Sequence, residues 1–211
     1  MKKLILTQRV DYIEEYGEYR DAIDQNLIKL IRQLKCLPYI IPNNLFSKKD
    51  SDQEKIKIIN FWISNTKPSG IILSGGNDLG EYSSRDATEL LLLEYAKNNK
   101  MPVLGICRGM QLMAQFFGTG LVKVKNHVGA KNSLKFKKNT LFPEIVKCFH
   151  NYAISSCPKG FKINARSEDG NIEAISHNSL PFEGFMWHPE REYPFLKEDI
   201  IRIKKLFKII N

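Results

Sequence analysis

One cysteine of this sequence stands in a position suited to nucleophilic chemistry. Cys107 lies between Gly105 and Gly109 in "VLGICRGMQ", directly after an apolar run that is typical of a buried strand. A Gly-x-Cys-x-Gly segment where a strand meets a helix is the cysteine form of a nucleophile elbow, a sharp turn that presents its side chain above the sheet edge. The N–H groups at a helix start favour a thiolate. We therefore predict that Cys107 is a nucleophile; the alternative is a buried structural cysteine.

A thiol nucleophile needs a base for its proton and a third group that holds the imidazole. The segment "MWHPE" offers both, as His188 and Glu190, after the apolar stretch "FEGFMW". In an extended segment residues two apart point the same way, so we expect Glu190 to support His188. Because these residues lie far from Cys107 in the chain, only the fold can bring them together.

A third segment, "SGGND", follows another predicted strand and contains Gly75 and Gly76. Consecutive glycines leave backbone N–H groups free to face a developing oxyanion, together with the N–H of Arg108 that follows the nucleophile. A Gly-Gly pair by itself is more often a simple turn. Taken with Cys107 and His188, it predicts an acyl-transfer site.

Short apolar runs alternate with helical patterns in the first half of the chain, which is typical of βαβ units and a parallel sheet. After Phe117 the sequence favours strands and turns. The predicted strands are Leu4–Thr7, 38–42, 70–76 and Met101–Ile106. The predicted helices are Tyr19–Lys35, one that a Ser51–Glu54 capping box opens toward Ile63, 85–99, and a terminal amphipathic helix Asp199–Ile210 that we expect to pack on the sheet. We predict an α/β fold with a mostly parallel central sheet flanked by helices.

The size and composition of the chain limit its classes. We predict one catalytic domain over residues 1–211, and a cytoplasmic location because no signal peptide or membrane span is found. Four cysteines without a CxxC pair indicate reduced thiols, and neither a disulfide framework nor a metal site. The net charge of +9 favours anionic partners, which include nucleic acid, a membrane surface and phosphorylated small molecules. No nucleic-acid-binding signature is present, so we expect a small-molecule substrate.

The three segments together resemble the class I glutamine amidotransferase family. Its members carry a Gly-x-Cys-x-Gly-x-Gln elbow, a glycine-rich oxyanion strand and a late His-Pro-Glu, matched here by 105–111, 75–76 and 188–190. The resemblance covers nearly the whole chain and implies a flavodoxin-like sheet with Cys107 at its carboxyl edge. It further implies a Cys107–His188–Glu190 triad that hydrolyses a γ-glutamyl amide through a thioester, without cofactor or metal. "RDATELLLLEYAKNNKMPVLGICRGMQLM" and the opening "LTQRVDY" look most like the branch that needs no synthetase partner.

The resemblance also implies residues that contact the glutamyl group. Gln111 would help to fix it, and a family segment of the type Val-Asn-Ser-Phe-His-Asn-Gln corresponds here to 146–152. His150 and Asn151 match this pattern, and we expect His150 to be structural or adjacent to the substrate. The departures, which leave the substrate open, are Lys147, Cys148 and Tyr152. His127 and His177 receive no role.

The basic chain favours an anionic leaving group. Within the family, "SGGNDLGEYS" and "CFHNYAI" are similar to the γ-glutamyl-CDP-amidate hydrolases of bacterial capsular phosphoramidate synthesis. That similarity implies a nucleotide-linked substrate and makes four cations candidates for contact with a diphosphate: Arg9, Arg108, Lys123 and Lys125. The alternatives are a hydrolase of γ-glutamyl amines such as γ-glutamyl-GABA, a glutaminase subunit that passes ammonia to a synthetase, and a binding protein with a dead site.

Overall fold

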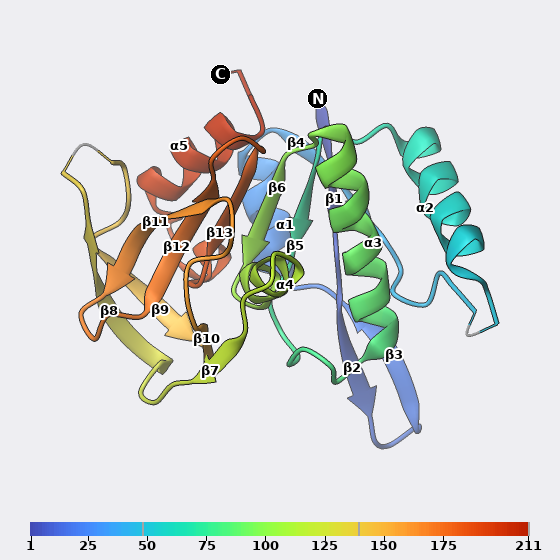
Figure 1. The fold of residues 1–211 in the computed structure, drawn as a ribbon, viewed down its shortest axis with the longest axis horizontal. Helices are drawn as coiled ribbons and strands as arrows, with labels where there is room; N and C mark the ends of the chain where they lie inside the picture. Colours follow the sequence, from blue (N-terminus) through green and yellow to red (C-terminus); the bar gives the residue numbers. More distant parts are fainter. Residues whose placement is uncertain (48, 139, 211) are drawn as a thin grey trace.

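The computed structural model describes residues 1–47, 49–138 and 140–210, which form a three-layer arrangement around one large sheet (Figure 1). The nine strands of this sheet lie in the order β4-β1-β5-β6-β13-β12-β11-β8-β9. The parallel strands are β1 (Lys2–Leu6), β4 (Cys36–Ile40), β5 (Gly70–Leu73), β6 (Val103–Ile106) and β13 (Phe182–Phe185). The antiparallel strands beyond them are β12 (Ile172–His177), β11 (Phe161–Ser167), β8 (Val128–Phe136) and β9 (Ile145–Phe149). The predicted α/β fold with a large central sheet flanked by helices is confirmed.

In the described part of the chain, five α-helices cover the two faces of the sheet (Figure 1). One core layer holds apolar residues of α1 (Gln25–Gln33) and α5 (Lys197–Leu206) against the sheet. The other holds α2 (Asp52–Thr66), α3 (Ser83–Asn99) and α4 (Arg108–Phe116). The strand β6 is buried at each of its four residues, as its continuous apolar run predicts for a strand covered on both faces.

The parallel strands bring their carboxyl ends to one edge of the sheet. In the register of β5, β6 and β13, Leu73 lies beside Gly105 and Ile106 lies beside Phe185. The segments that follow these strands are the glycine-rich turn, the cysteine elbow and the late histidine segment. Ligand and catalytic groups of open α/β sheets lie at this edge.

The predicted helix Tyr19–Lys35 is wrong in its first third. A hairpin of β2 (Arg9–Ile13) and β3 (Glu18–Ala22) occupies that region, turning at Gly17 with φ +62°, a conformation that glycine adopts without strain. The helix α1 begins only after Asp24, whose side chain accepts a hydrogen bond from Asn26 N at 2.8 Å. The apolar spacing of the helix continues by chance on the N-terminal side of Asp24, although this N-cap residue marks the point where the helix begins.

The remaining expected elements differ from the structure by small shifts. The strand expected at 38–42 is β4 (Cys36–Ile40), and the capping box of Ser51 and Glu54 is present at the start of α2. The terminal helix begins at Lys197 and packs on the sheet through Ile203 and Leu206. Within the described part of the chain, no helix has the length and apolar character to cross a membrane. A further pair of short strands, β7 (Leu121–Lys123) and β10 (Tyr152–Ile154), lies beside the site.

Candidate active site

Cys107 lies at the sharp turn between β6 and α4. Its backbone has φ 50° and ψ −105°, a strained conformation for a residue with a side chain, and its N–H donates to Phe185 O at 2.7 Å. Side chains at the flanking glycines would collide with backbone, because a Cβ on Gly105 would lie 2.6 Å from Gly109 C and one on Gly109 would meet Leu73. The two glycines therefore let α4 start directly against the sheet, with Cys107 at its N-terminus.

Gly75 and Gly76 lie at the end of β5, next to the late histidine. A Cβ added to Gly75 would lie 2.5 Å from His188 Cε1, so only glycine allows the imidazole to sit this close to the turn. Gly76 has φ +83°. Gly76 and Arg108 line the same pocket as Cys107, as the predicted oxyanion site requires.

His188 and Glu190 form a close buried pair. His188 Nδ1 and Glu190 Oε1 are 2.6 Å apart, and both side chains are at most 5% exposed. The segment is not extended as expected: Pro189–Arg191 form a single 3-10 turn, η1, which folds Glu190 back under the ring. The pairing follows from the turn, because the proline fixes φ at the start of it. The second carboxylate oxygen, Glu190 Oε2, has no hydrogen-bond partner among the described residues.

Glu190 and Cys107 raise the pKa of His188. Burial alone would lower the pKa of His188, but hydrogen bonds with Cys107 and Glu190 and the charge of Glu190 raise it to about 9. At neutral pH the ring is therefore an imidazolium beside Cys107, from which it can supply a proton to a leaving group.

We expect activity to fall as pH rises through about 9, since His188 then loses its proton. Glu190→Gln keeps a hydrogen-bond acceptor for Nδ1 and removes the negative charge that raises the histidine pKa. The alkaline limb of kcat/KM should then move to lower pH, and activity at neutral pH should fall by about 10² to 10⁴-fold, as for a triad carboxylate. A pH–rate profile of both proteins tests this. An unchanged alkaline limb in the variant would show that Glu190 does not act on His188.

A buried arginine that the sequence analysis missed holds the glycine-rich turn. Arg85 of α3 donates to the carbonyls of Ser74 at 2.8 Å and Gly75 at 3.0 Å, and also to Gly76 O. Its side chain is fully buried and pairs with Glu89 at 3.1 Å. Burial lowers its pKa to about 10, so it stays charged at neutral pH. The guanidinium therefore holds the carbonyl side of the turn whose Gly75 lies against His188.

The side chain of Arg108 completes this network and is not free for a substrate. It pairs with Asp86 and with Glu89, and only 2% of it is exposed. The expectation that Arg108 could meet a diphosphate is therefore wrong for its guanidinium, while its backbone N–H stays beside Cys107. The set of two arginines, Glu89 and the partly buried Asp86 is neutral overall, which lowers the cost of burying the three other charges.

A narrow pocket of about 100 Å³ opens in front of Cys107. Gln111, His150 and Asn151 line it with His188, so the structure brings these sequence-predicted residues together. Gln111 Nε2 donates to Tyr152 O at 2.8 Å, and His150 Nδ1 lies 3.0 Å from the same oxygen. Tyr152 thus shapes the wall through its backbone, an interaction that does not depend on its side chain.

A second hollow of about 240 Å³ lies on the other side of His188. Arg9 lines it, next to Gly76, with its Nε 2.7 Å from Asp11. Arg191, which the sequence analysis did not single out, lines both hollows and stacks on Phe149 at 4.6 Å. Among their described lining residues, neither hollow includes Lys123 or Lys125, the other expected cations.

Lys147 and Cys148, two of the departures from the family pattern, lie in different surroundings. Lys147 is not among the described residues that line either hollow, and its Nζ pairs with Glu192 at 3.4 Å. Cys148 is fully buried beside Glu173, with a sulfur–oxygen distance of 3.8 Å. His177 packs among phenylalanine rings at the opposite end of the sheet, in keeping with the absence of an assigned role.

Sequence comparisons place these observations among known proteins. Residues 17–202 match the family model described as glutamine amidotransferase class-I. A gamma-glutamyl-CDP-amidate hydrolase from Campylobacter jejuni is 38% identical over 147 residues, which cover 67% of this chain and 70% of the relative. A glutamine-hydrolyzing GMP synthase subunit from Pyrococcus abyssi is 36% identical over 183 residues, covering 82% of this chain and 87% of the relative.

Solved structures agree with the fold. A protein described as a GMP synthase subunit from Thermoplasma acidophilum superimposes with a TM-score of 0.67 at 23% identity, covering 99% of this chain and 94% of the other. A glutamine amidotransferase from Thermotoga maritima gives a TM-score of 0.62 at 17% identity, with 98% and 84% covered. At these identities the likeness concerns the arrangement of the sheet and its helices.

Proposed function

Because the chain belongs to the class I glutamine amidotransferase family, we propose that it is a cysteine-dependent hydrolase that releases glutamate from a γ-glutamyl amide. The observation that carries this proposal is the meeting of Cys107, His188 and the Gly75–Gly76 turn at one sheet edge. In the proposed triad Cys107 is the nucleophile, His188 the acid and base, and Glu190 the group that orients and charges the ring.

The geometry supports a two-step reaction. The Cys107 thiolate attacks the γ-carbonyl carbon, and the carbonyl oxygen takes the negative charge toward the N–H groups of Gly76 and Arg108. When the C–N bond breaks, the His188 imidazolium gives its proton to the leaving nitrogen and a thioester forms. The now neutral His188 takes a proton from water, whose oxygen attacks the thioester. Glutamate leaves and Cys107 regains the thiolate.

We further propose that the leaving group is cytidine diphosphoramidate, released from γ-glutamyl-CDP-amidate. Support comes from the Campylobacter jejuni relative, which carries that activity in its name, and from the second hollow with Arg9 and Arg191 at its edge. Guanidinium groups pair with phosphate through two parallel hydrogen bonds. The narrow pocket with Gln111 and Asn151 would then hold the glutamyl group, and Arg191 would stand where the two parts of the substrate join.

Arg191→Ala should raise KM for γ-glutamyl-CDP-amidate by about 10 to 100-fold, as expected for the loss of one charged hydrogen-bond pair, while KM for glutamine changes little. Arg32→Ala is the matched control, because Arg32 lies in the last turn of α1, away from both hollows. Steady-state kinetics on both substrates measure the effect. Equal losses on both substrates would contradict a role for Arg191 in leaving-group binding.

The relatives that are GMP synthase subunits favour a second candidate, a glutaminase subunit that works with a synthetase. We propose instead that the chain acts without an obligate protein partner, on the basis of its opening hairpin segment and its resemblance to the self-sufficient branch. The alternative predicts glutamine turnover that appears only when a partner is added.

Glutamate release by the purified protein tests both candidates. The substrates are γ-glutamyl-CDP-amidate, glutamine and γ-glutamyl amines, including γ-glutamyl-GABA. Strong preference for the nucleotide supports the proposal, whereas preference for simple amines makes the chain a γ-glutamyl amine hydrolase. No release from any of them by the chain alone would favour the partner-dependent glutaminase.

A further inference from the structure

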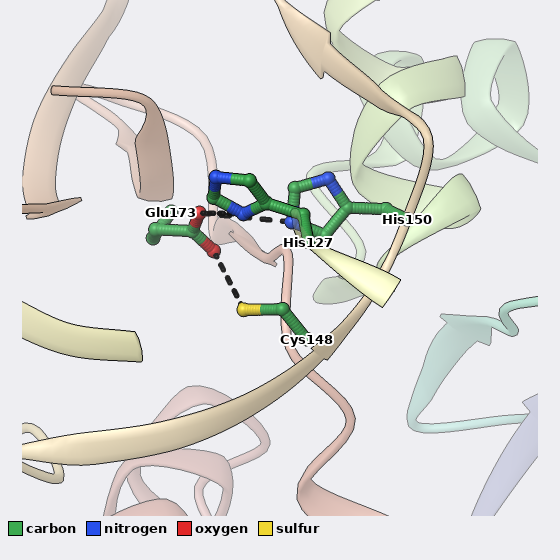
Figure 2. Close-up of side chains that lie close together, drawn as sticks. All are labelled: His127, Cys148, His150 and Glu173. Carbon is green, nitrogen blue, oxygen red and sulfur yellow. Dashed lines mark hydrogen bonds and ion pairs between the residues drawn. The ribbon is translucent and has the colours of Figure 1, made fainter. Parts of the chain in front are cut away.

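Four side chains that the proposed reaction does not use converge behind the pocket wall: His127, Cys148, His150 and Glu173 (Figure 2). Each is buried, and their ligand atoms all lie within 4.8 Å of one another. His127 Nδ1 and His150 Nε2 lie 3.6 and 3.7 Å from the same Glu173 oxygen, Oε1, and Cys148 Sγ lies 3.8 Å from Oε2. Ligands on one tetrahedral zinc ion stand about 3.4 to 3.6 Å apart, so side-chain shifts of up to about 1 Å would close a set whose ligand atoms lie within 4.8 Å of one another.

Two atoms of the cluster lack the partner that burial demands. Among the described residues, His150 Nε2 and Glu173 Oε1 have no hydrogen-bond partner, although their side chains are 1% and 0% exposed. A buried carboxylate without a partner is costly, and it is normally paired or bound to a metal. Both atoms point into the space that the four side chains enclose (Figure 2).

Neighbouring groups select the tautomer in which each imidazole offers a lone pair to the cluster. His150 Nδ1 lies 3.0 Å from Tyr152 O, which can only accept, so Nδ1 carries the proton and Nε2 is left bare. His127 Nε2 lies 2.8 Å from Asp169 Oδ2, which leaves Nδ1 as the inward acceptor. Asn132 Nδ2 donates to that Nδ1 at 2.9 Å and would have to release it. Carboxylate and carbonyl partners of this kind support metal-binding histidines.

We propose that His127, Cys148, His150 and Glu173 form a binding site for one zinc ion. Two imidazoles, a thiolate and a carboxylate suit Zn²⁺, whereas Mg²⁺ and Ca²⁺ require oxygen ligands. The charges balance, because the dication meets one thiolate and one carboxylate. Burial and the nearby Glu173 raise the pKa of the Cys148 thiol, so the metal-free protein keeps that proton and zinc binding releases it.

The zinc ion would act by holding the wall of the pocket in front of Cys107 and would not take part in the reaction itself. Cys148 and His150 flank Phe149 at the end of β9, where His150 and Asn151 line the pocket in front of Cys107. His127 precedes β8 and Glu173 belongs to β12, so one ion would tie three separate segments together behind this wall. Residue spacing did not indicate this site, because its ligands come from three segments that lie far apart in the chain. The chain also lacks a CxxC pair.

Zinc binding is best measured in a Cys107→Ala background, where the proposed triad supplies no competing thiol. After removal of metal with a chelator, we expect addition of Zn²⁺ to give about one bound ion per chain by elemental analysis and a rise of several degrees in Tm. With Co²⁺ in place of zinc, a thiolate charge-transfer band and tetrahedral visible bands should appear. These readouts do not depend on turnover, so they stand apart from the proposed hydrolysis.

Two variants and one control localise the site. Cys148→Ala should lose the thiolate band and at least tenfold in zinc affinity, whereas Cys157→Ala, the matched control, should lose neither, because Cys157 lies outside the cluster. Glu173→Gln is nearly isosteric and should weaken zinc by about 10 to 100-fold even if Cys148→Ala folds poorly. The proposal is overturned if zinc does not bind stoichiometrically. It is equally overturned if cobalt binds without a thiolate band or if the Cys148 and Cys157 variants bind zinc alike.

Discussion

Cys107→Ala should lower kcat for γ-glutamyl amide hydrolysis by at least about 10⁴-fold, because no other described side chain of the site can form the thioester. The substitution removes one sulfur from a residue whose backbone already sits in the strained elbow, so the fold and Tm should change little. Glutamate release under saturating substrate, together with mass spectrometry of a trapped glutamyl-enzyme in the native protein, measures the effect.

Cys157→Ala is the matched control for this experiment, since Cys157 is a free cysteine outside the site and its loss should leave kcat unchanged. Turnover by the Cys107 variant at the native rate would show that the proposed mechanism is wrong. A covalent glutamyl adduct on any other residue would show the same.

Arg85→Met should have the largest effect on stability. It removes a buried charge that pairs with Glu89 and donates to carbonyls of the glycine-rich turn, and it leaves Glu89 with Arg108 alone. Breaking a buried ion pair in this way costs about 3 to 5 kcal/mol of unfolding free energy. Because the turn also loses the donors that orient it, kcat should fall by about 10² to 10³-fold, as for a lost oxyanion donor. Denaturant unfolding and kinetics at a temperature well below Tm measure both effects.

Arg202→Met separates general destabilisation from the effect on the turn. Arg202 of α5 is a partly buried arginine paired with Glu183 at 2.7 Å, and it lies away from the site. We expect this control to lose stability and keep kcat. A folded Arg85→Met protein with native kcat would contradict the role of Arg85 in holding the glycine-rich turn.

The sequence was informative where chemistry and fold share one local pattern. Gly105, Cys107 and Gly109 are typical of a turn at a strand-to-helix junction, so one segment predicted both the elbow and the strand before it. The same holds for Gly75 and Gly76 after β5. Parallel strands place their carboxyl ends at one edge, which explains why the three segments meet in the structure.

The features that the sequence did not reveal depend on contacts between distant residues. Arg85 reads as one of many charges in a helix, and its burial follows only from the approach of α3 to the glycine-rich turn. The cluster around Glu173 has ligands on three segments, which no local spacing links. The hairpin before α1 was hidden because its apolar residues continue the helical period, and Asp24 alone marks the boundary.

The place of β13 in the sheet has a consequence for synthesis of the chain. β13 lies between β6 and β12, so the strand that precedes His188 enters the sheet after both of its neighbours have been translated. Contacts between residues so far apart in sequence form late and slowly in folding. During translation the elbow with Cys107 therefore emerges from the ribosome long before its base. The nascent chain then carries the thiol without its proposed general base, and the proposed hydrolytic site is complete only after β13 has joined the sheet.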